Sequence, residues 1–228
     1  PDRVTPRCRH FGWCGGCSLQ HLAHAAQLVA KGSQVAEELE RIGGVRPATW
    51  LAPLAGPVWS YRRRARLGCK YVVAKGRVLV GFRERGSPYL ADLQHCEVLV
   101  EPVGNLIAEL AELIGGLSIR DRLPQIEVAA ADNAIVLVLR VLDPPSEADL
   151  AKLREFQARR AIELHLQPGG LDTVMPLTPP ATALRYALPD VPAGIGFAPT
   201  DFIQVNAGLN RQMIERALEL LSPRADDK

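Results

Sequence analysis

Three closely spaced cysteines near the start of the chain constrain its fold more than any other feature. Cys8, Cys14 and Cys17 lie in the segment C-R-H-F-G-W-C-G-G-C. Thiols this dense, in a chain that we expect to stay in a reducing compartment, indicate a bound metal or catalysis rather than disulfides. The two glycines before Cys17 leave the backbone free to wrap around an ion or cluster, and their amides can donate to bound sulfur. The trio therefore predicts a metal-binding loop.

A soft metal site prefers four sulfur ligands, so the trio needs one more thiolate. Cys69 falls on the apolar face of an expected strand, and we expect it to be buried as a small hydrophobic residue. Cys96 lies in the polar segment D-L-Q-H-C-E, where a ligand can project, and we predict it as the fourth ligand. His10, His21 and His95 could substitute as ligands, but ordinary packing or capping is their expected role.

The cysteine spacing favours an iron–sulfur cluster over zinc. Structural zinc sites usually combine two C-x2-C pairs, and this chain has one. A dense trio with a remote fourth cysteine is closer to the spacing of iron–sulfur proteins. Zinc stays open as the alternative.

The net charge of +2 hides a strongly basic block. Residues 59–90 hold nine Lys and Arg against one acidic residue, Glu84, for a local charge of +8, while residues 91–228 carry −8. In an extended strand over residues 61–71, basic side chains alternate with apolar ones and share one face. These are Arg62, Arg64, Arg66 and Lys70. Such a surface attracts phosphate backbones, so we predict RNA or DNA contact, with a solvated edge strand as the alternative.

Length and composition define the class of protein. A chain of 228 residues that is 47% hydrophobic can bury a core as one large domain or two small ones. No apolar run approaches the roughly 18 to 20 residues that cross a bilayer, and the N-terminus lacks the order of a signal peptide. We expect a soluble cytoplasmic protein without a membrane partner.

Periodicity and turn signals predict an α+β fold of antiparallel hairpins with packed helices and an N-terminal cysteine loop. Helices are expected over 19–42, 98–114, 147–159 and 207–221, with Ser146 and Asn206 capping the last two. Hairpins are expected over 61–82 and 125–142, turning at 74–76 and 132–133. A strand is expected at 162–166, and 168–192 reads as a loop with one short strand at 184–188. This order lacks the regular alternation of a doubly wound sheet.

Five segments, taken together, resemble a known family. They are C-R-H-F-G-W-C-G-G-C-S-L-Q-H at 8–21, Y-R-R-R-A-R-L at 61–67, G-F-R-E-R-G-S at 81–87, H-C at 95–96 and F-A-P-T-D-F-I-Q-V-N at 197–206. In this order they are similar to the bacterial 23S ribosomal RNA uracil-C5 methyltransferases that carry a [4Fe-4S] cluster. The transfer-RNA branch of that superfamily lacks the cluster cysteines, so the resemblance favours the ribosomal branch.

The resemblance implies roles for individual residues. It makes the trio and Cys96 the cluster ligands, whereas Cys69 matches no ligand. Arg66 aligns with an arginine near the bound RNA. Gln204 would hydrogen-bond S-adenosylmethionine, and Phe202 could pack beside a uracil turned out of the RNA. The residues alone also allow a simple helix entry here, with Phe202 in the core.

The resemblance also implies parts that we do not find. The family's reaction uses a cysteine thiolate that attacks uracil C6, the methyl donor and a general base. These belong to a C-terminal Rossmann-like domain with a Gly-rich loop and a D-P-P-R-x-G segment; Asp143-Pro144-Pro145 lacks the following Arg and Gly. We therefore expect the central region of a longer enzyme, cut at Pro1 and at Asp226-Asp227-Lys228, and catalytically inactive alone.

The expected division is a cluster and basic-hairpin region at 1–96, the rest of the central domain at 97–206, and a helix at 207–228 leading to the catalytic domain. The expected partner is 23S ribosomal RNA, with no obligate protein partner and a monomeric state. Two alternatives remain at this stage. One is a stand-alone RNA-binding module stapled by zinc or a cluster; the other is a redox protein, which leaves the basic block unexplained.

Overall fold

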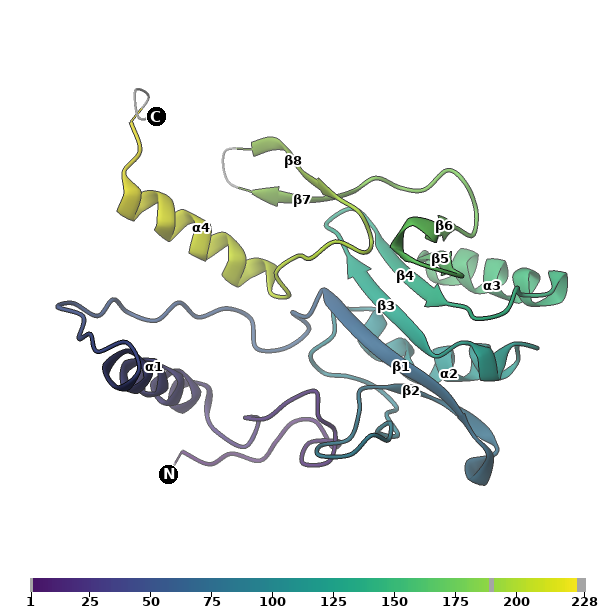
Figure 1. The fold of residues 1–228 in the computed structure, drawn as a ribbon, viewed down its shortest axis with the longest axis horizontal. Helices are drawn as coiled ribbons and strands as arrows, with labels where there is room; N and C mark the ends of the chain where they lie inside the picture. Colours follow the sequence, from purple (N-terminus) through teal and green to yellow (C-terminus); the bar gives the residue numbers. More distant parts are fainter. Residues whose placement is uncertain (1, 189–190, 225–228) are drawn as a thin grey trace.

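The computed structural model describes residues 2–188 and 191–224, so the expected cuts at Pro1 and Asp226-Asp227-Lys228 lie outside the described residues. Figure 1 shows a twisted sheet with helices against it and two helices standing apart. The helices are α1 His24–Arg41, α2 Ile107–Gly115, α3 Glu147–Arg160 and α4 Ala207–Leu221. The strands are β1 Arg64–Val72, β2 Arg77–Gly81, β3 Gln125–Ala130, β4 Ile135–Arg140, β5 Glu163–Gln167, β6 Met175–Pro176, β7 Leu184–Leu188 and β8 Val191–Phe197.

Six of these strands form one sheet in the order β2-β1-β3-β4-β5-β6, and β7 pairs with β8 separately. Both predicted hairpins are confirmed. The first turns through a short 3-10 segment, Val73–Lys75, and Gly76, whose φ of +64° lies in the left-handed region that glycine adopts at no steric cost. The second joins β3 to β4 across the predicted turn at residues 132–133.

The structure corrects the expected fold in three places. β4 and β5 pair in parallel, because α3 crosses between them, so the sheet is mixed rather than built from antiparallel hairpins alone. The predicted loop at 168–192 contains β6 and the start of β8 as well as the expected β7. The helix predicted from residue 98 begins only at Ile107, after a 3-10 turn at Val103–Leu106.

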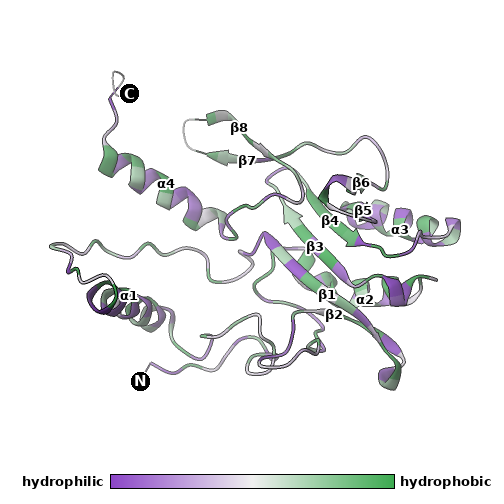
Figure 2. Ribbon diagram, in the orientation of Figure 1, coloured by the Kyte–Doolittle hydropathy of each residue, from purple (hydrophilic) through white to green (hydrophobic). Residues whose placement is uncertain are grey.

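One face of the sheet and the helices α2 and α3 enclose the main core. Leu67 on β1, Ile126 on β3 and Leu137 on β4 are fully buried there, against Ile107 of α2 and Phe156 of α3. Figure 2 shows the same pattern as a hydrophobic band through β3 and β4. Each fully buried side chain of this size contributes about 1.5–3 kcal/mol. The core therefore holds β1 in place, and β1 carries the basic side chains.

The predicted start of α3 is confirmed as a capping box. The Ser146 hydroxyl accepts from the Asp149 N–H, and the Asp149 carboxylate accepts from the Ser146 N–H at 3.1 Å. Asp149 is 1% exposed and also accepts from the Ser118 N–H at 2.8 Å. Burial raises its pKa, but the hydrogen bonds from Ser118 and Ser146 outweigh that effect and lower the pKa to about 2.

The helices α1 and α4 lie apart from the sheet, with the segment 42–60 running between them (Figure 1). Neither contains a buried residue. The predicted cap of α4 is confirmed, since the Asn206 side chain accepts from the Leu209 N–H at 3.0 Å. Among the described residues, no helix combines the length and the apolar character needed to cross a membrane.

Candidate metal centre and nucleic-acid interface

The four cysteines predicted as ligands line a single cavity. Cys8, Cys14, Cys17 and Cys96 surround an empty volume of about 330 Å³, part of which opens to solvent. All four are partly buried, whereas Cys69 is 6% exposed in the core, as predicted. The fold thus gathers a trio from the N-terminus and a thiol from beyond the basic hairpin, and it separates the fifth cysteine from them.

Backbone hydrogen bonds fix both sides of this cavity. The Cys14 N–H donates to the His10 carbonyl at 3.0 Å, and the next N–H, from Gly15, donates to the Arg83 carbonyl at 2.8 Å. On the other side, the Cys96 N–H donates to the Gly104 carbonyl at 2.9 Å. The cysteine loop is therefore tied to the segment after β2, and Cys96 is held by the turn that precedes α2.

The two glycines between Cys14 and Cys17 are required by close packing. A Cβ on Gly15 would lie 2.9 Å from the Arg83 carbonyl oxygen, and a Cβ on Gly16 would lie 2.9 Å from the Phe82 ring. The Gly16 N–H also lies 3.4 Å from the Cys14 sulfur and donates to it. This contact is the backbone donation to sulfur that the Gly-Gly pair led us to expect.

The cavity presents cysteine thiols that a bound metal group would hold as thiolates. Burial raises the pKa of Cys8 and Cys14, and raises that of Cys96 to about 11. A bound cation must therefore displace protons from these thiols, which makes its binding weaker as pH falls. His10 also lines the cavity, and its Nδ1 is buried without a hydrogen-bond partner among the described residues. An orphaned polar atom beside four thiols fits a site built for a further group.

The histidine rings near the cavity pack against neighbouring side chains. The His10 ring lies 5.8 Å from the His95 ring, and His95 contacts Glu97 at 2.8 Å. The His21 ring packs 5.6 Å from Phe11. Within residues 2–188 and 191–224, no group of three or more His, Cys, Asp or Glu side chains stands close enough to hold a single metal ion.

The predicted basic face of β1 exists, but the fold supplies acidic partners that the basic block itself lacks. Arg66 pairs directly with Glu127 across the β1–β3 ladder, and its guanidinium lies 2.9 Å from the carboxylate. Arg64 binds the other oxygen of Glu127 at 2.6 Å. The side chain of Arg64 is 16% exposed and that of Arg66 is 69% exposed. Lys70 is exposed on the same strand.

Arg62 and Arg63 join this strand to two other predicted motifs. The Arg62 N–H donates at 2.7 Å to Val98, two residues beyond Cys96. The Arg63 N–H donates at 3.0 Å to Val205, in the F-I-Q-V-N segment. The guanidinium of Arg62 lies 6.0 Å from the Phe82 ring, and its Nε is buried without a partner in the described part of the chain.

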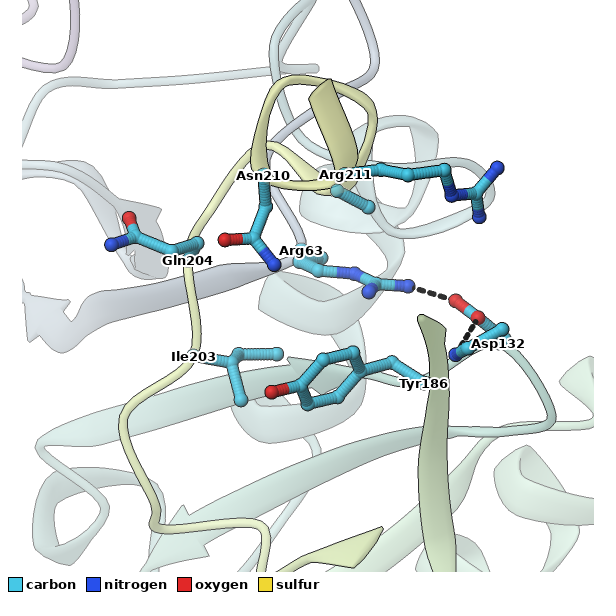
Figure 3. A pocket seen from close by; sticks show the side chains of 9 residues that line it. Arg63, Asp132, Tyr186, Ile203, Gln204, Asn210 and Arg211 are labelled. Carbon is cyan, nitrogen blue, oxygen red and sulfur yellow. Dashed lines mark hydrogen bonds and ion pairs between the residues drawn. The ribbon is translucent and has the colours of Figure 1, made fainter. Parts of the chain in front are cut away.

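Arg63 also organises a polar pocket at the edge of the sheet (Figure 3). Its side chain is 10% exposed and pairs with Asp132, which also accepts from the Ala187 N–H of β7 at 2.8 Å. Burial raises the pKa of Asp132, and these two hydrogen bonds more than offset it, so that the pKa is lowered. Tyr186, Gln204 and Arg211 line the same pocket.

The two residues implied at the donor and base site lie near this pocket. Gln204 is exposed and lines the pocket, but its side chain points away from the Arg63–Asp132 pair (Figure 3). Phe202 is 81% exposed, so the expectation that it could pack in the core is wrong. The neighbouring Ile203 is buried in its place, at 6% exposure.

Sequence reasoning missed the acidic partners of the basic block. Glu127 lies between the buried Ile126 and Val128 and is 5% exposed. A carboxylate inside an otherwise apolar strand requires a cation, because a buried unpaired charge is costly. A single carboxylate within an apolar strand was therefore the signal in the sequence that could have identified Glu127 as the partner of a cation. The role of Asp132 had no comparable signal, since turn chemistry alone explains that residue.

Comparisons with known proteins support the resemblance. No family model matches the chain. It is 50% identical over 227 residues to the 23S rRNA (uracil(1939)-C(5))-methyltransferase RlmD of Ralstonia nicotianae, and 49% identical over 228 residues to that of Aromatoleum aromaticum. These alignments cover 100% of this chain but 50% and 53% of the relatives. The chain therefore spans about half the length of the curated relatives it matches.

A solved structure shares the fold. The Pyrococcus abyssi tRNA (uracil-54, C5)-methyltransferase, in complex with S-adenosyl-L-homocysteine, superposes with a TM-score of 0.63. The match covers 96% of this chain and 52% of that one, at 18% sequence identity. At this identity the similarity concerns the fold alone, and it confirms the mixed α+β architecture.

Proposed function

We propose that this chain is the RNA-binding and cluster-bearing part of an S-adenosylmethionine-dependent enzyme that methylates C5 of a uridine in 23S ribosomal RNA. The supporting observation is identity of about 50%, over the whole chain, with curated 23S rRNA (uracil-C5)-methyltransferases. Since the chain spans about half of each relative, the complete activity requires the remaining half of such a polypeptide.

In this proposal, Cys8, Cys14, Cys17 and Cys96 hold a [4Fe-4S] cluster. The support is that the four thiols line one cavity. A polynuclear cluster accepts four separated thiolates, one at each iron. Bound there, the cluster would tie the N-terminal loop to the segment after the basic hairpin, so we assign it a structural role.

We also propose that the chain is divided into three regions, as the sequence led us to expect. Residues 1–96 carry the cluster and the basic hairpin, residues 97–206 complete the central domain, and residues 207–228 lead toward the catalytic half. S-adenosylmethionine supplies the methyl group when it is bound to the complete enzyme. Gln204 binds this donor and Phe202 packs against the target base, consistent with their exposure on one short segment. Arg62, Arg64, Arg66 and Lys70 face the RNA.

This chain by itself is then expected to transfer no methyl group. The nucleophilic cysteine needed to attack uracil C6 has no candidate here, because four cysteines are assigned to the cluster and Cys69 is buried. Burial also raises the pKa of Cys69 strongly, so that it stays a neutral thiol. We further propose that the protein acts as a monomer in the cytoplasm.

The test is methyl transfer by the complete polypeptide. Labelled S-adenosylmethionine and unmethylated 23S rRNA are incubated with the complete protein or with this chain alone, and the product nucleoside is identified by mass spectrometry. We expect 5-methyluridine from the complete protein and none from the chain alone. RNA binding without methylation by the complete protein would favour the zinc- or cluster-stapled binding module. Methylation by the chain alone would contradict the proposed division of labour.

A further inference from the structure

Ion pairs hold several cations of the basic block that we propose to face the RNA. Several of its cations are held by carboxylates from other parts of the fold, at distances near 2.6–2.9 Å. The paired residues are Arg63, Arg64, Arg66, Lys75 and Arg77, and their partners are Asp132, Glu127 and Asp92. A paired cation offers less to a phosphate, because binding must compete with its existing partner.

Unpaired cations gather beside the cysteine loop. Arg9, Arg83 and Arg85 are exposed, and none of them forms an ion pair within the described parts of the chain. Arg83 donates to the Pro88 carbonyl, and the Arg9 Nε donates to the His10 Nε2 at 3.5 Å, so neither of these hydrogen bonds is to a carboxylate. Glu84 is the acidic residue of this segment and is partly buried.

Backbone pairing places one exposed aromatic residue, Trp13, on the same face as Arg83 and Arg85, and a second, Tyr89, on the opposite face beside Glu84. The Arg85 N–H donates to the Trp13 carbonyl at 2.6 Å, and the Glu84 N–H donates to the Tyr89 carbonyl at 2.9 Å. The segment 83–85 is thus flanked by the cysteine loop on one side and by residues 89–91 on the other. Trp13 is 47% exposed and Tyr89 is 68% exposed.

The Trp13 ring is held in place as well as exposed. Its centroid lies 5.9 Å from the ring of the buried His10, and the next residue is the predicted ligand Cys14. A ring fixed on one side and open on the other loses little entropy when a base stacks on it. Base stacking on aromatic side chains, combined with cations that follow the backbone, is how proteins hold single-stranded nucleic acid.

We propose that Arg9, Trp13, Arg83 and Arg85, the loop surface, bind a single-stranded segment of the RNA substrate. A base stacks on Trp13, and the three arginines contact phosphates. This inference rests on the proposed function, since it takes RNA as the substrate, and it adds where an unpaired segment is held. It also links the cluster to RNA recognition, because the loop that carries Trp13 is the loop that carries three of the four predicted ligands.

The test measures binding of a fluorescent single-stranded 23S rRNA fragment to the complete protein, purified without oxygen, across a range of salt concentrations. Trp13→Ala should weaken binding about tenfold, and Trp13→Phe should retain most of the affinity. Arg85→Ala should reduce the slope of log K against log salt by about one. Iron content and the thermal unfolding midpoint of each variant show whether the fold is intact.

Two matched controls come from the same chain. Trp50 is 54% exposed in the segment 42–60 and is not part of the loop surface, so Trp50→Ala should leave RNA affinity unchanged. Arg77 is paired with Asp92, so Arg77→Ala should leave the salt slope unchanged. Variants Trp13→Ala and Arg85→Ala that bind like wild type, while the wild-type protein still binds and methylates RNA, overturn this inference alone. A wild-type protein that binds no RNA overturns the proposed function instead.

Discussion

The backbone N–H of Arg63 donates to the carbonyl oxygen of Val205 at 3.0 Å, which joins the basic strand to the F-I-Q-V-N segment. The preceding N–H, from Arg62, donates in the same way to Val98, next to the Cys96 loop. Two consecutive residues thus connect three motifs that lie far apart in the sequence.

Loss of the remote cysteine should affect metal content and stability together. Cys96→Ser removes one of four thiols around the cavity, so we expect loss of iron, a lower unfolding midpoint in urea and weaker RNA binding. Cys69→Ala is the matched control, because Cys69 is buried away from the cavity. It should keep full iron content and lose about 1 kcal/mol of stability. Iron loss with unchanged stability and RNA affinity in Cys96→Ser would show that the cluster has no structural role.

The Gly-Gly pair allows a test of the cavity walls. Gly15→Ala places a methyl group 2.9 Å from the Arg83 carbonyl, so the cysteine loop must move away from the segment after β2. We expect lower iron content and a lower unfolding midpoint. Gly32→Ala, in the exposed helix α1, meets no atom within 4 Å and should stabilise the protein by up to about 1 kcal/mol. Equal effects of the two substitutions would mean that close packing at Gly15 does not shape the site.

The Glu127 carboxylate on β3, which Arg64 and Arg66 share, should weaken the binding of RNA to the basic face of β1. Glu127→Gln leaves Arg64 and Arg66 without their ion pair, which should lower the free energy of unfolding by about 1–3 kcal/mol. The same change frees two cations, so RNA affinity at low salt should rise and its salt dependence should steepen. Urea unfolding and RNA titration at several salt concentrations measure both effects. Unchanged RNA affinity would place this face outside the RNA contact.

The capping box of α3 predicts a specific pH dependence. The pKa of Asp149 is lowered to about 2 in the folded protein, whereas an unfolded aspartate titrates near 3.9. Its contribution, about 2 kcal/mol, is therefore present above pH 4 and is lost as pH falls from about 4 toward 2. Asp149→Asn should destabilise the protein at pH 7, and its difference from wild type should shrink toward pH 2. A constant difference between pH 7 and pH 2 would contradict the assignment.

Local signals in the sequence explain what could be predicted of the fold. Several features depend only on residues that are a few positions apart in the sequence. They are the turn at Asp132-Asn133, the helix caps at Ser146 and Asn206, and the burial of Cys69. The parallel pairing of β4 with β5 was missed because it depends on how α3 packs. The start of β8 was missed because its P-A-G-I-G sequence has the composition of a loop.

The candidate site could be predicted only where its residues carry a local signal in the sequence. Thiol chemistry and spacing selected the trio, and the polar segment around Cys96 selected the fourth cysteine that lines the cavity. The neutralisation of Arg64 and Arg66 could not be read from the basic block, because Glu127 lies about sixty residues further along and meets them only through the β1–β3 register. Charge density in a sequence therefore overstates the positive surface of a fold when neighbouring strands carry the opposite charge.

The most direct test of the account is the metal content of this chain, purified without oxygen and analysed for iron, acid-labile sulfide and zinc. A [4Fe-4S] cluster held by Cys8, Cys14, Cys17 and Cys96 predicts about four iron and four sulfide per chain, with the visible absorbance of thiolate-bound iron. A colourless protein with one zinc per chain and no sulfide would contradict it.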